Sequence, residues 1–347
     1  MRFFCAILLL ALSALSLRAE TPSSAAQQNF ASKLAGIVAG LEKENAAAAL
    51  GIDGWLFFGG ELRLLSLGHF WGADAAKVSR AHKRELADPL SAIVDFHQQL
   101  KAHGIELLLV PVPPKAAIYP EKIVAGFDAQ ASNPSVHLRQ FYAELGAAGI
   151  DVLDLTALFI QDRENGRGPV FCKTDSHWSG VGCAFAAQAI AEKVRAKVTG
   201  PGAPGNFAGE WKDVQITGDL AGLLPKDAPK PGPEKITLQN VSRKDGAAVE
   251  PDANSPLLLM GDSHTLVYHD FLSERAGLVD QLALQLGFAP DLIGTRGSGA
   301  TPVRINLYRR TAKDPAYLTK KKVVVWCFAA REFTEATEGW AKVPLVK

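Results

Sequence analysis

The chain has 347 residues, which is enough for one large domain or two modest ones, with a hydrophobic core that needs no disulfide scaffold. Apolar residues make up 48% and charged residues 21% of the sequence, a globular composition that argues against a disordered chain. The formal net charge of +1 lacks the basic excess expected of a nucleic-acid binder. Beyond the N-terminus no run of ~18 apolar residues occurs, which excludes a polytopic membrane protein.

The first 19 residues have the layout of a secretory signal peptide. Arg2 supplies a positive start, residues 3–17 are apolar apart from two serines, and the run ends at the small residue Ala19. Because Leu17 stands where a small residue is preferred, an uncleaved membrane anchor is the alternative. Either way, the pattern predicts an exported protein.

Export bears on the three cysteines beyond the signal segment, Cys172, Cys183 and Cys327. In an oxidising compartment one pair is expected to be bridged, and Cys172 and Cys183 are the natural pair because they bracket a short loop. The alternative is that all three are small buried side chains, as the apolar neighbours of Cys327 suggest. The sequence contains no CxxC motif and no Cys/His spacing typical of zinc sites.

Helical and extended patterns alternate along the chain. Residues 20–48 predict a helix that acts as a spacer or packs on the body, and further helices are predicted at residues 80–103, 134–148, 179–198 and 265–276. Apolar strands are predicted at residues 105–112, 150–155, 256–260, 292–295 and 322–328. Residues 199–255 are rich in Gly, Pro, Lys and Asp and predict an irregular excursion with short strands. Apolar strands that alternate with helices indicate a parallel sheet covered on both faces.

The motif GDSHT at residues 261–265 follows one of these strands directly. A serine at a strand-to-helix turn stands at the carboxyl end of the sheet, where open α/β sheets bind ligands. The N–H of Ser263 would lie near a helix N-terminus, which suits a developing oxyanion. The alternative is that Asp262 and Ser263 only cap a helix.

A second polar motif, DSHW at residues 175–178, precedes a predicted helix. A nucleophilic serine needs a base within hydrogen-bond reach, and the base needs an orienting carboxylate. We therefore expect His177 to accept the proton of Ser263 and Asp175 to hold the other imidazole nitrogen. The alternative is a solvated loop histidine with Trp178 packed on the core. His264, next to the serine in sequence, is expected to be a neighbour and not the base.

With both motifs in place, the chain resembles the SGNH (GDSL-like) hydrolase superfamily, and its Asp-x-His-Trp form resembles the branch that contains the alginate O-acetyltransferases AlgJ and AlgX. Further similar segments are GIDGWLF at residues 51–57, VPVPPK at 110–115, GDL at 218–220 and the pair Arg331-Glu332. The resemblance implies a three-layer α/β/α fold with a mostly parallel central sheet over residues 49–347. By this similarity Ser263 is the nucleophile, His177 the base and Asp175 its partner.

Other site residues are less well defined by the resemblance. Gly297 matches the glycine that donates to the oxyanion in such enzymes, but no asparagine stands at an equivalent place, so Arg296 or Arg331 is the expected substitute. Lys115 follows a strand and is expected to contact a polysaccharide carboxylate, with a solvated lysine as the alternative. Trp178 is expected to stack on a sugar ring, with burial in the core as the alternative.

The function implied by the resemblance is O-acetylation of an alginate-like exopolysaccharide in the periplasm through an acetyl-serine intermediate, in a soluble protein or one tethered to the inner membrane. The acetyl donor would be a membrane-bound O-acyltransferase partner, and no metal or cofactor would be needed. An acetylesterase that uses water as acceptor shares the same three residues and is the first alternative. A non-catalytic polysaccharide-binding assembly protein is the second.

Overall fold

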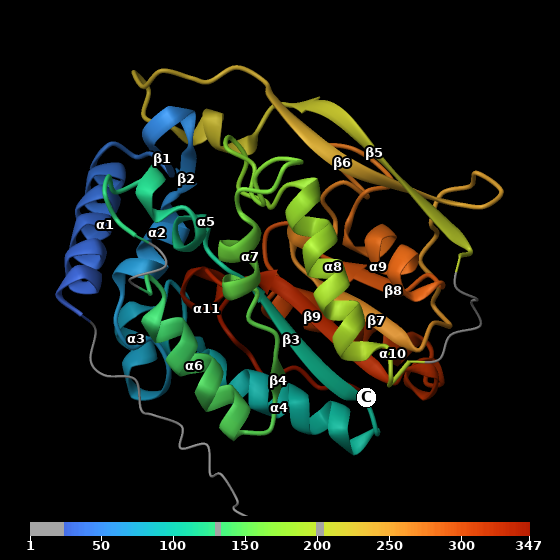
Figure 1. Ribbon diagram of the computed structural model, residues 1–347. Helices are drawn as coiled ribbons and strands as arrows, with labels where there is room; N and C mark the ends of the chain where they lie inside the picture. The colour runs from blue at the N-terminus through green and yellow to red at the C-terminus, as the bar shows by residue number, and fades with distance from the viewer. Residues whose placement is uncertain (1–23, 129–132, 199–204) are drawn as a thin grey trace, which may run out of the picture.

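The computed structural model describes residues 24–128, 133–198 and 205–347 (Figure 1). The predicted signal peptide or anchor at residues 1–19 lies outside this range. Among the helices of the described residues, none combines the length and the apolar character that a membrane crossing requires.

A five-stranded sheet in the order β4-β3-β9-β7-β8 forms the centre of the molecule. All its pairings are parallel, which confirms the predicted sheet type. The strands are β3 (Glu106–Val112), β4 (Asp151–Val152), β7 (Leu257–Gly261), β8 (Asp291–Gly294) and β9 (Val323–Ala329). Every residue of β7 and β9 is buried, as expected for central strands covered on both faces.

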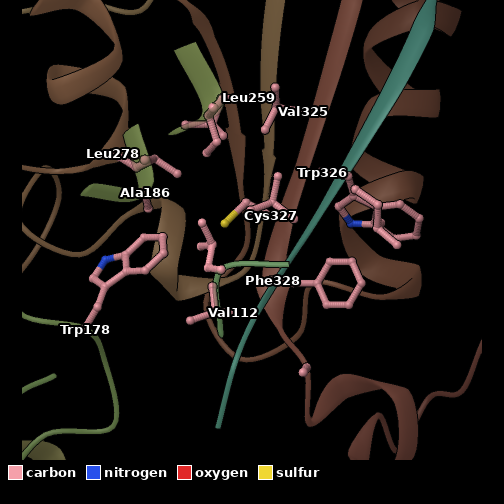
Figure 2. Packing of buried hydrophobic residues seen from close by; sticks show 14 of the residues in the cluster. Val112, Trp178, Ala186, Leu259, Leu278, Val325, Trp326, Cys327 and Phe328 are labelled. Atoms are coloured by element: carbon pink, nitrogen blue, oxygen red, sulfur yellow. The ribbon is translucent and has the colours of Figure 1, made fainter. Parts of the chain in front are cut away.

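Helices cover both faces of this sheet. Successive side chains of β9 point to opposite sides, so Trp326 and Cys327 lie in different layers of the core (Figure 2). Trp326 packs on Phe96 of α4 (Pro89–Ala102), with ring centroids 5.2 Å apart. On the side of Cys327 lie Ala186 of α8 (Gly180–Val194) and Leu278 of α9 (Leu278–Leu286). The structure is therefore the expected three-layer α/β/α sandwich.

The N-terminal part of the described chain adds a layer beside the sheet. Helix α1 (Ala25–Lys43) buries Phe30 and Leu34 and contacts α2 (Gly59–Ser66), so this segment packs on the body. Strands β1 (Ala48–Leu50) and β2 (Leu56–Phe58) form an antiparallel pair next to it (Figure 1). The remaining helices are α3 (Ala75–Val78), α5 (Lys115–Ile118), α6 (Val136–Ala147), α7 (Thr156–Asp162), α10 (Thr301–Lys313) and α11 (Glu332–Glu335).

The Gly- and Pro-rich segment at residues 199–255 is more regular than predicted. Its described part contains a long antiparallel ribbon of β5 (Phe207–Ile216) and β6 (Glu234–Arg243), paired along the whole length of both strands. Ile236 and Leu238 of β6 are buried, whereas β5 is mostly exposed. Because β5 buries only its last residue, Ile216, and the buried positions of β6 are interrupted by polar residues, the apolar signal of the ribbon is weak in the sequence.

The predicted helix at residues 265–276 is wrong. The chain makes a single 3₁₀ turn at Ser263–Thr265 and then a loop in which Tyr268 and Leu272 have φ angles of 65° and 61°. Such φ values are incompatible with a right-handed helix. The hydroxyl of Tyr268 donates to the backbone oxygen of Trp178 at 2.9 Å, a tertiary contact that outweighs the helical spacing of the apolar residues. The next helix, α9, begins at Leu278.

The predicted disulfide is also wrong. Cys172 and Cys183 are free and buried, as is Cys327. The sulfur of Cys172 lies 3.1 Å from the hydroxyl of Tyr268, and that of Cys183 contacts the backbone oxygen of Ala276. Burial raises the pKa of all three thiols well above the ordinary value. The alternative of small buried side chains is therefore confirmed.

Candidate active site

Several candidate residues meet at the carboxyl edge of the sheet, because parallel strands end on the same side. Lys115 follows β3, Ser263 follows β7, Gly297 follows β8 and Arg331 follows β9. A cleft of about 570 Å³ opens here, and Ser263, His177, Gly297 and Arg331 are among the residues that line it.

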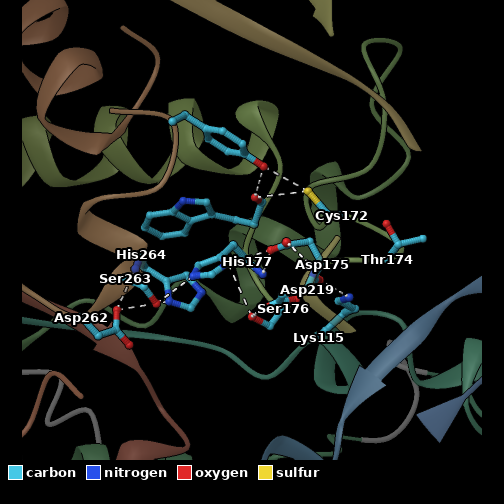
Figure 3. A network of polar contacts seen from close by, with 12 residues as sticks. Lys115, Cys172, Thr174, Asp175, Ser176, His177, Asp219, Asp262, Ser263 and His264 are labelled. Carbon is cyan, nitrogen blue, oxygen red and sulfur yellow. Dashed lines mark hydrogen bonds and ion pairs between the residues drawn. The ribbon is translucent and has the colours of Figure 1, made fainter. Parts of the chain in front are cut away.

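The two sequence motifs meet in this cleft and form a continuous hydrogen-bonded chain (Figure 3). The Nε2 atom of His177 lies 2.7 Å from the Oγ of Ser263, and its Nδ1 atom lies 2.7 Å from an Oδ1 of Asp175. Burial opposes ionisation of Asp175, but the hydrogen bond and charge of His177 outweigh it and lower the pKa of the carboxyl. An ionised Asp175 can therefore hold the imidazole and stabilise an imidazolium.

Asp219 holds the loop that carries this base. Its carboxylate accepts from the N–H of Ser176 at 2.7 Å and from the hydroxyl of Ser176 at 2.6 Å, while its own N–H donates to Asp175 at 3.0 Å. This approach requires glycine at position 218, since a Cβ there would lie 2.1 Å from the oxygen of Thr174. The GDL segment at residues 218–220 therefore positions the base loop from a distance of more than forty residues in sequence.

Lys115 supports the same loop and does not face substrate, contrary to the prediction. Its side chain is fully buried, and its ammonium donates to the backbone oxygens of Asp175 at 2.6 Å and Leu56 at 2.9 Å. Burial lowers the pKa of Lys115, an effect that the nearby Glu61 and Asp175 oppose. Both the predicted substrate contact and the solvated alternative are thus wrong, and Lys115 ties the base loop to β2.

Asp262 and His264, the neighbours of the candidate nucleophile, are structural. Asp262 accepts from the N–H of His264 at 2.9 Å and from the N–H of Ala329 at 2.8 Å, which joins the ends of β7 and β9. The imidazole of His264 is fully buried, which lowers its pKa, and its ring centroid lies 4.7 Å from that of His177. Gly261 makes the close approach of the strands possible, because a Cβ there would meet the oxygen of Cys327.

The remaining predicted site residues divide into two groups. Gly297 and Arg331 line the cleft, whereas Trp178 has no exposed surface and contacts His264 edge to face, so its predicted sugar contact is wrong. Arg296 is outside the cleft lining, where it pairs with Asp270 at 3.0 Å. Its predicted role as an oxyanion donor is therefore not met in this arrangement.

An acidic pair adjoins Gly297 and was not identified from the sequence. The buried carboxyl of Glu332 lies 2.7 Å from the hydroxyl of Ser298, which also contacts the carboxylate of Glu338. Burial raises the pKa of Glu332 to about 7, while the nearby Arg331 opposes the shift. Glu332 lines the cleft and fixes Ser298, the residue after Gly297.

Asp175, His177 and Asp219 also bring potential metal-ligating atoms within 4.8 Å of one another. In the described structure each of these groups already has protein hydrogen-bond partners: His177 joins Asp175 to Ser263, and Asp219 binds Ser176. The cluster is therefore explained by the hydrogen-bonded chain, and its geometry is that of a nucleophile, a base and an orienting carboxylate.

Comparison with known proteins gives the family of the chain. A family model described as "SGNH hydrolase-like domain, acetyltransferase AlgX" matches residues 48–330. A probable alginate O-acetylase AlgJ of Pseudomonas putida is 29% identical over 293 residues, covering 81% of this chain and 69% of the relative. The corresponding protein of Pseudomonas aeruginosa is 31% identical over 179 residues, covering 51% of this chain and 41% of the relative.

Solved structures extend the comparison to the fold. The O-acetyltransferase domain of Pseudomonas putida AlgJ superposes with a TM-score of 0.62 at 26% identity, covering 83% of this chain and 92% of that domain. Pseudomonas aeruginosa AlgX superposes with a TM-score of 0.58 at 18% identity, covering 89% of this chain and 67% of the other, and shares the fold. Fold and family together define an SGNH hydrolase-like enzyme that transfers acyl groups. The chain belongs to the AlgX acetyltransferase family within that class, and it is an O-acetyltransferase.

Proposed function

We propose that this chain transfers acetyl groups to hydroxyls of an exopolysaccharide in the periplasm, with Ser263, His177 and Asp175 as its catalytic triad. The observation that carries the proposal is the continuous chain of two 2.7 Å contacts from Asp175 through His177 to Ser263. The position of Ser263 in an open cleft supports it, because donor and acceptor must both reach the nucleophile. The relatives named alginate O-acetylase support a polysaccharide acceptor.

The proposed reaction has two steps. In the first, the Oγ of Ser263 attacks the acetyl carbonyl while its proton moves to Nε2 of His177, and the departing donor group takes that proton as the acetyl-serine forms. In the second, His177 accepts the proton of a sugar hydroxyl as that oxygen attacks the acetyl-serine, and Ser263 recovers the proton when its bond to the acetyl group breaks. Asp175 stabilises the imidazolium in both steps.

Charge that develops on the acetyl oxygen needs donors beside Ser263. We assign this role to the N–H groups of Ser263 and Gly297 and to the guanidinium of Arg331. Gly297 and Arg331 line the cleft together with Ser263. Arg331 is held by an ion pair with Glu61 at 3.0 Å, and although burial opposes its charge, that carboxylate keeps its pKa raised.

The acetyl donor is proposed to be a membrane-bound O-acyltransferase, because acetyl-CoA is not available outside the cytoplasm. The signal-like residues 1–19 support export, and they also allow attachment to the inner membrane beside such a partner.

Replacement of the nucleophile tests the proposal. Ser263→Ala should reduce release of p-nitrophenol from p-nitrophenyl acetate to background and abolish the acetylated enzyme detected by intact mass. Ser242→Ala on the β5–β6 ribbon, outside the cleft lining, is the matched control and should behave as wild type. Acetylated glycan as the product supports transfer, whereas free acetate as the main product with glycan present would make the chain an esterase. Wild-type turnover by Ser263→Ala would remove Ser263 from the nucleophile role.

A further inference from the structure

The charged side chains that line the cleft include no unpaired arginine in the described structure. They comprise three arginines and four carboxylates. Arg63 pairs with Glu335 at 2.5 Å, and Arg80 pairs with Glu42. The third arginine, Arg331, is paired with a carboxylate behind the cleft wall, as described above. Every arginine that lines the cleft in the described structure therefore already has a carboxylate partner.

These pairs oppose the binding of a polyanion. The Arg63 and Glu335 side chains are 15% and 17% exposed, so their charges are partly desolvated and separating them is costly. The outer pair is about half exposed, at 47% for Arg80 and 56% for Glu42, and an incoming carboxylate would meet Glu42 on arrival. A like-charged group placed beside such carboxylates is rejected more strongly than a neutral one.

The rest of the lining suits a neutral sugar. Val38 and Leu41 of α1 and Phe58 at the end of β2 provide apolar surface for the C–H faces of a sugar ring. Paired arginines and glutamates offer donors and acceptors side by side, and a hydroxyl group, which both donates and accepts, can use both. A carboxylate only accepts hydrogen bonds, so it can use the arginine donors but not the glutamate acceptors.

We infer that the acceptor is an uncharged glycan, a polymer of neutral sugars, and not a polyuronate. The inference rests on the proposed function, since it names the acceptor class of the same cleft. Alginate is a polyuronate, so the inference separates this chain from the relatives named alginate O-acetylase.

Two acceptors that differ in one group test the inference. β-1,4-linked mannohexaose carries a hydroxymethyl group where hexamannuronate carries a carboxylate. With p-nitrophenyl acetate as donor and the purified full chain, mass spectrometry of the acceptors gives kcat/KM for each. We expect mannohexaose to be preferred about tenfold or more, and the preference to shrink as salt screens the carboxylates. Equal or faster acetylation of hexamannuronate, or no acetylation of mannohexaose by an enzyme that forms acetyl-Ser263, would overturn the inference.

Failure of the proposed function is distinguishable, because no acetyl group would then appear on Ser263 with either acceptor. A charge variant tests the cause. Glu42→Gln combined with Glu335→Gln should narrow the preference for the neutral hexamer about fivefold, since each change removes a repelling carboxylate. Glu210→Gln, at a 72% exposed carboxylate on β5 outside the cleft lining, is the matched control. If the double variant keeps the same preference as this control, the lining carboxylates do not select the acceptor and the inference fails.

Discussion

Glu332 gives the sharpest quantitative prediction of stability. Its carboxyl is 4% exposed and contacts the hydroxyl of Ser298, which in turn contacts Glu338. The hydroxyl has one proton and can donate it to one carboxylate, so the other contact needs a proton from a carboxyl group. The raised pKa of Glu332, about 7, identifies it as the group that carries this proton. Asp262 and Glu338 add to the shift through their negative charges, and Arg331 opposes it.

The sign of the pH effect follows from this shift. The folded protein binds the proton of Glu332 more tightly than the unfolded chain does, for which the pKa is 4.5. The stabilisation is therefore fully present below pH 4.5 and is lost as the pH rises from 4.5 to about 7. Because the pKa of Glu332 is about 7 in the folded protein and 4.5 in the unfolded chain, Glu332 lowers the free energy of unfolding by about 3 kcal/mol at pH 8.

Glu332→Gln keeps the size of the side chain and supplies an N–H donor to Ser298 at every pH. We expect this variant to be up to about 3 kcal/mol more stable than wild type at pH 8 and about equally stable at pH 4.5. Urea unfolding followed by tryptophan fluorescence at both pH values measures the difference, and the effects of titrating groups that do not interact with Glu332 cancel in it. Glu210→Gln on the exposed ribbon is the control and should shift neither value. A Glu332→Gln effect that is the same at both pH values would refute the shared-proton argument.

Three further predictions concern the base loop. Asp219→Asn removes the charge that holds Ser176, and with p-nitrophenyl acetate as substrate it should lower kcat about 10- to 100-fold with little change in KM. An unchanged kcat would show that Asp219 is dispensable for turnover. Lys115→Met leaves the buried oxygens of Asp175 and Leu56 without a donor and should cost about 3 kcal/mol or more in urea unfolding, whereas a loss below about 1 kcal/mol would contradict its role. Asp175→Asn should lower turnover by ~10⁴, and adding this change to His177→Ala should lower turnover little further. Circular dichroism verifies that the variants fold. Losses that multiply in the double variant would show that Asp175 and His177 do not act on Ser263 as a unit.

The sheet could be predicted from sequence because its central strands are buried on both faces. The apolar runs at residues 105–112, 256–260 and 322–328 correspond within a residue or so to β3, β7 and β9. Polar motifs directly after such strands, or before a capped helix, located the three residues of the hydrogen-bonded chain. The loop after Ser263 was mispredicted because Val267 and Phe271, four residues apart, have spacing that also fits a helix, while the contact that decides the backbone, from Tyr268 to Trp178, joins residues far apart in sequence.

The roles of side chains whose partners lie far away in the sequence could not be predicted in this way. Nothing in the sequence around Lys115 distinguishes an ammonium that binds substrate from one that donates to buried carbonyls, because its acceptors lie about sixty residues away on both sides. Likewise, the GDL segment matched a family motif, but its contact with Ser176 exists only after folding. The cysteine pairing failed for a related reason, since proximity in sequence says little about where two sulfurs point.

The long ribbon at the edge of the molecule anchors the loop that carries His177. Glu234, the first residue of β6, accepts from the N–H groups of Lys173 and Thr174 at 2.7 and 2.8 Å. Asp219 and Lys115 take up the next polar backbone groups of the same loop, as described above. A loop with this many backbone groups hydrogen-bonded before substrate arrives has little to reorganise when His177 becomes charged, and such preorganisation is a main source of electrostatic catalysis. The segment with the weakest sequence signal thus holds one end of the proposed catalytic triad, and shortening the ribbon should impair turnover although it lies outside the sheet.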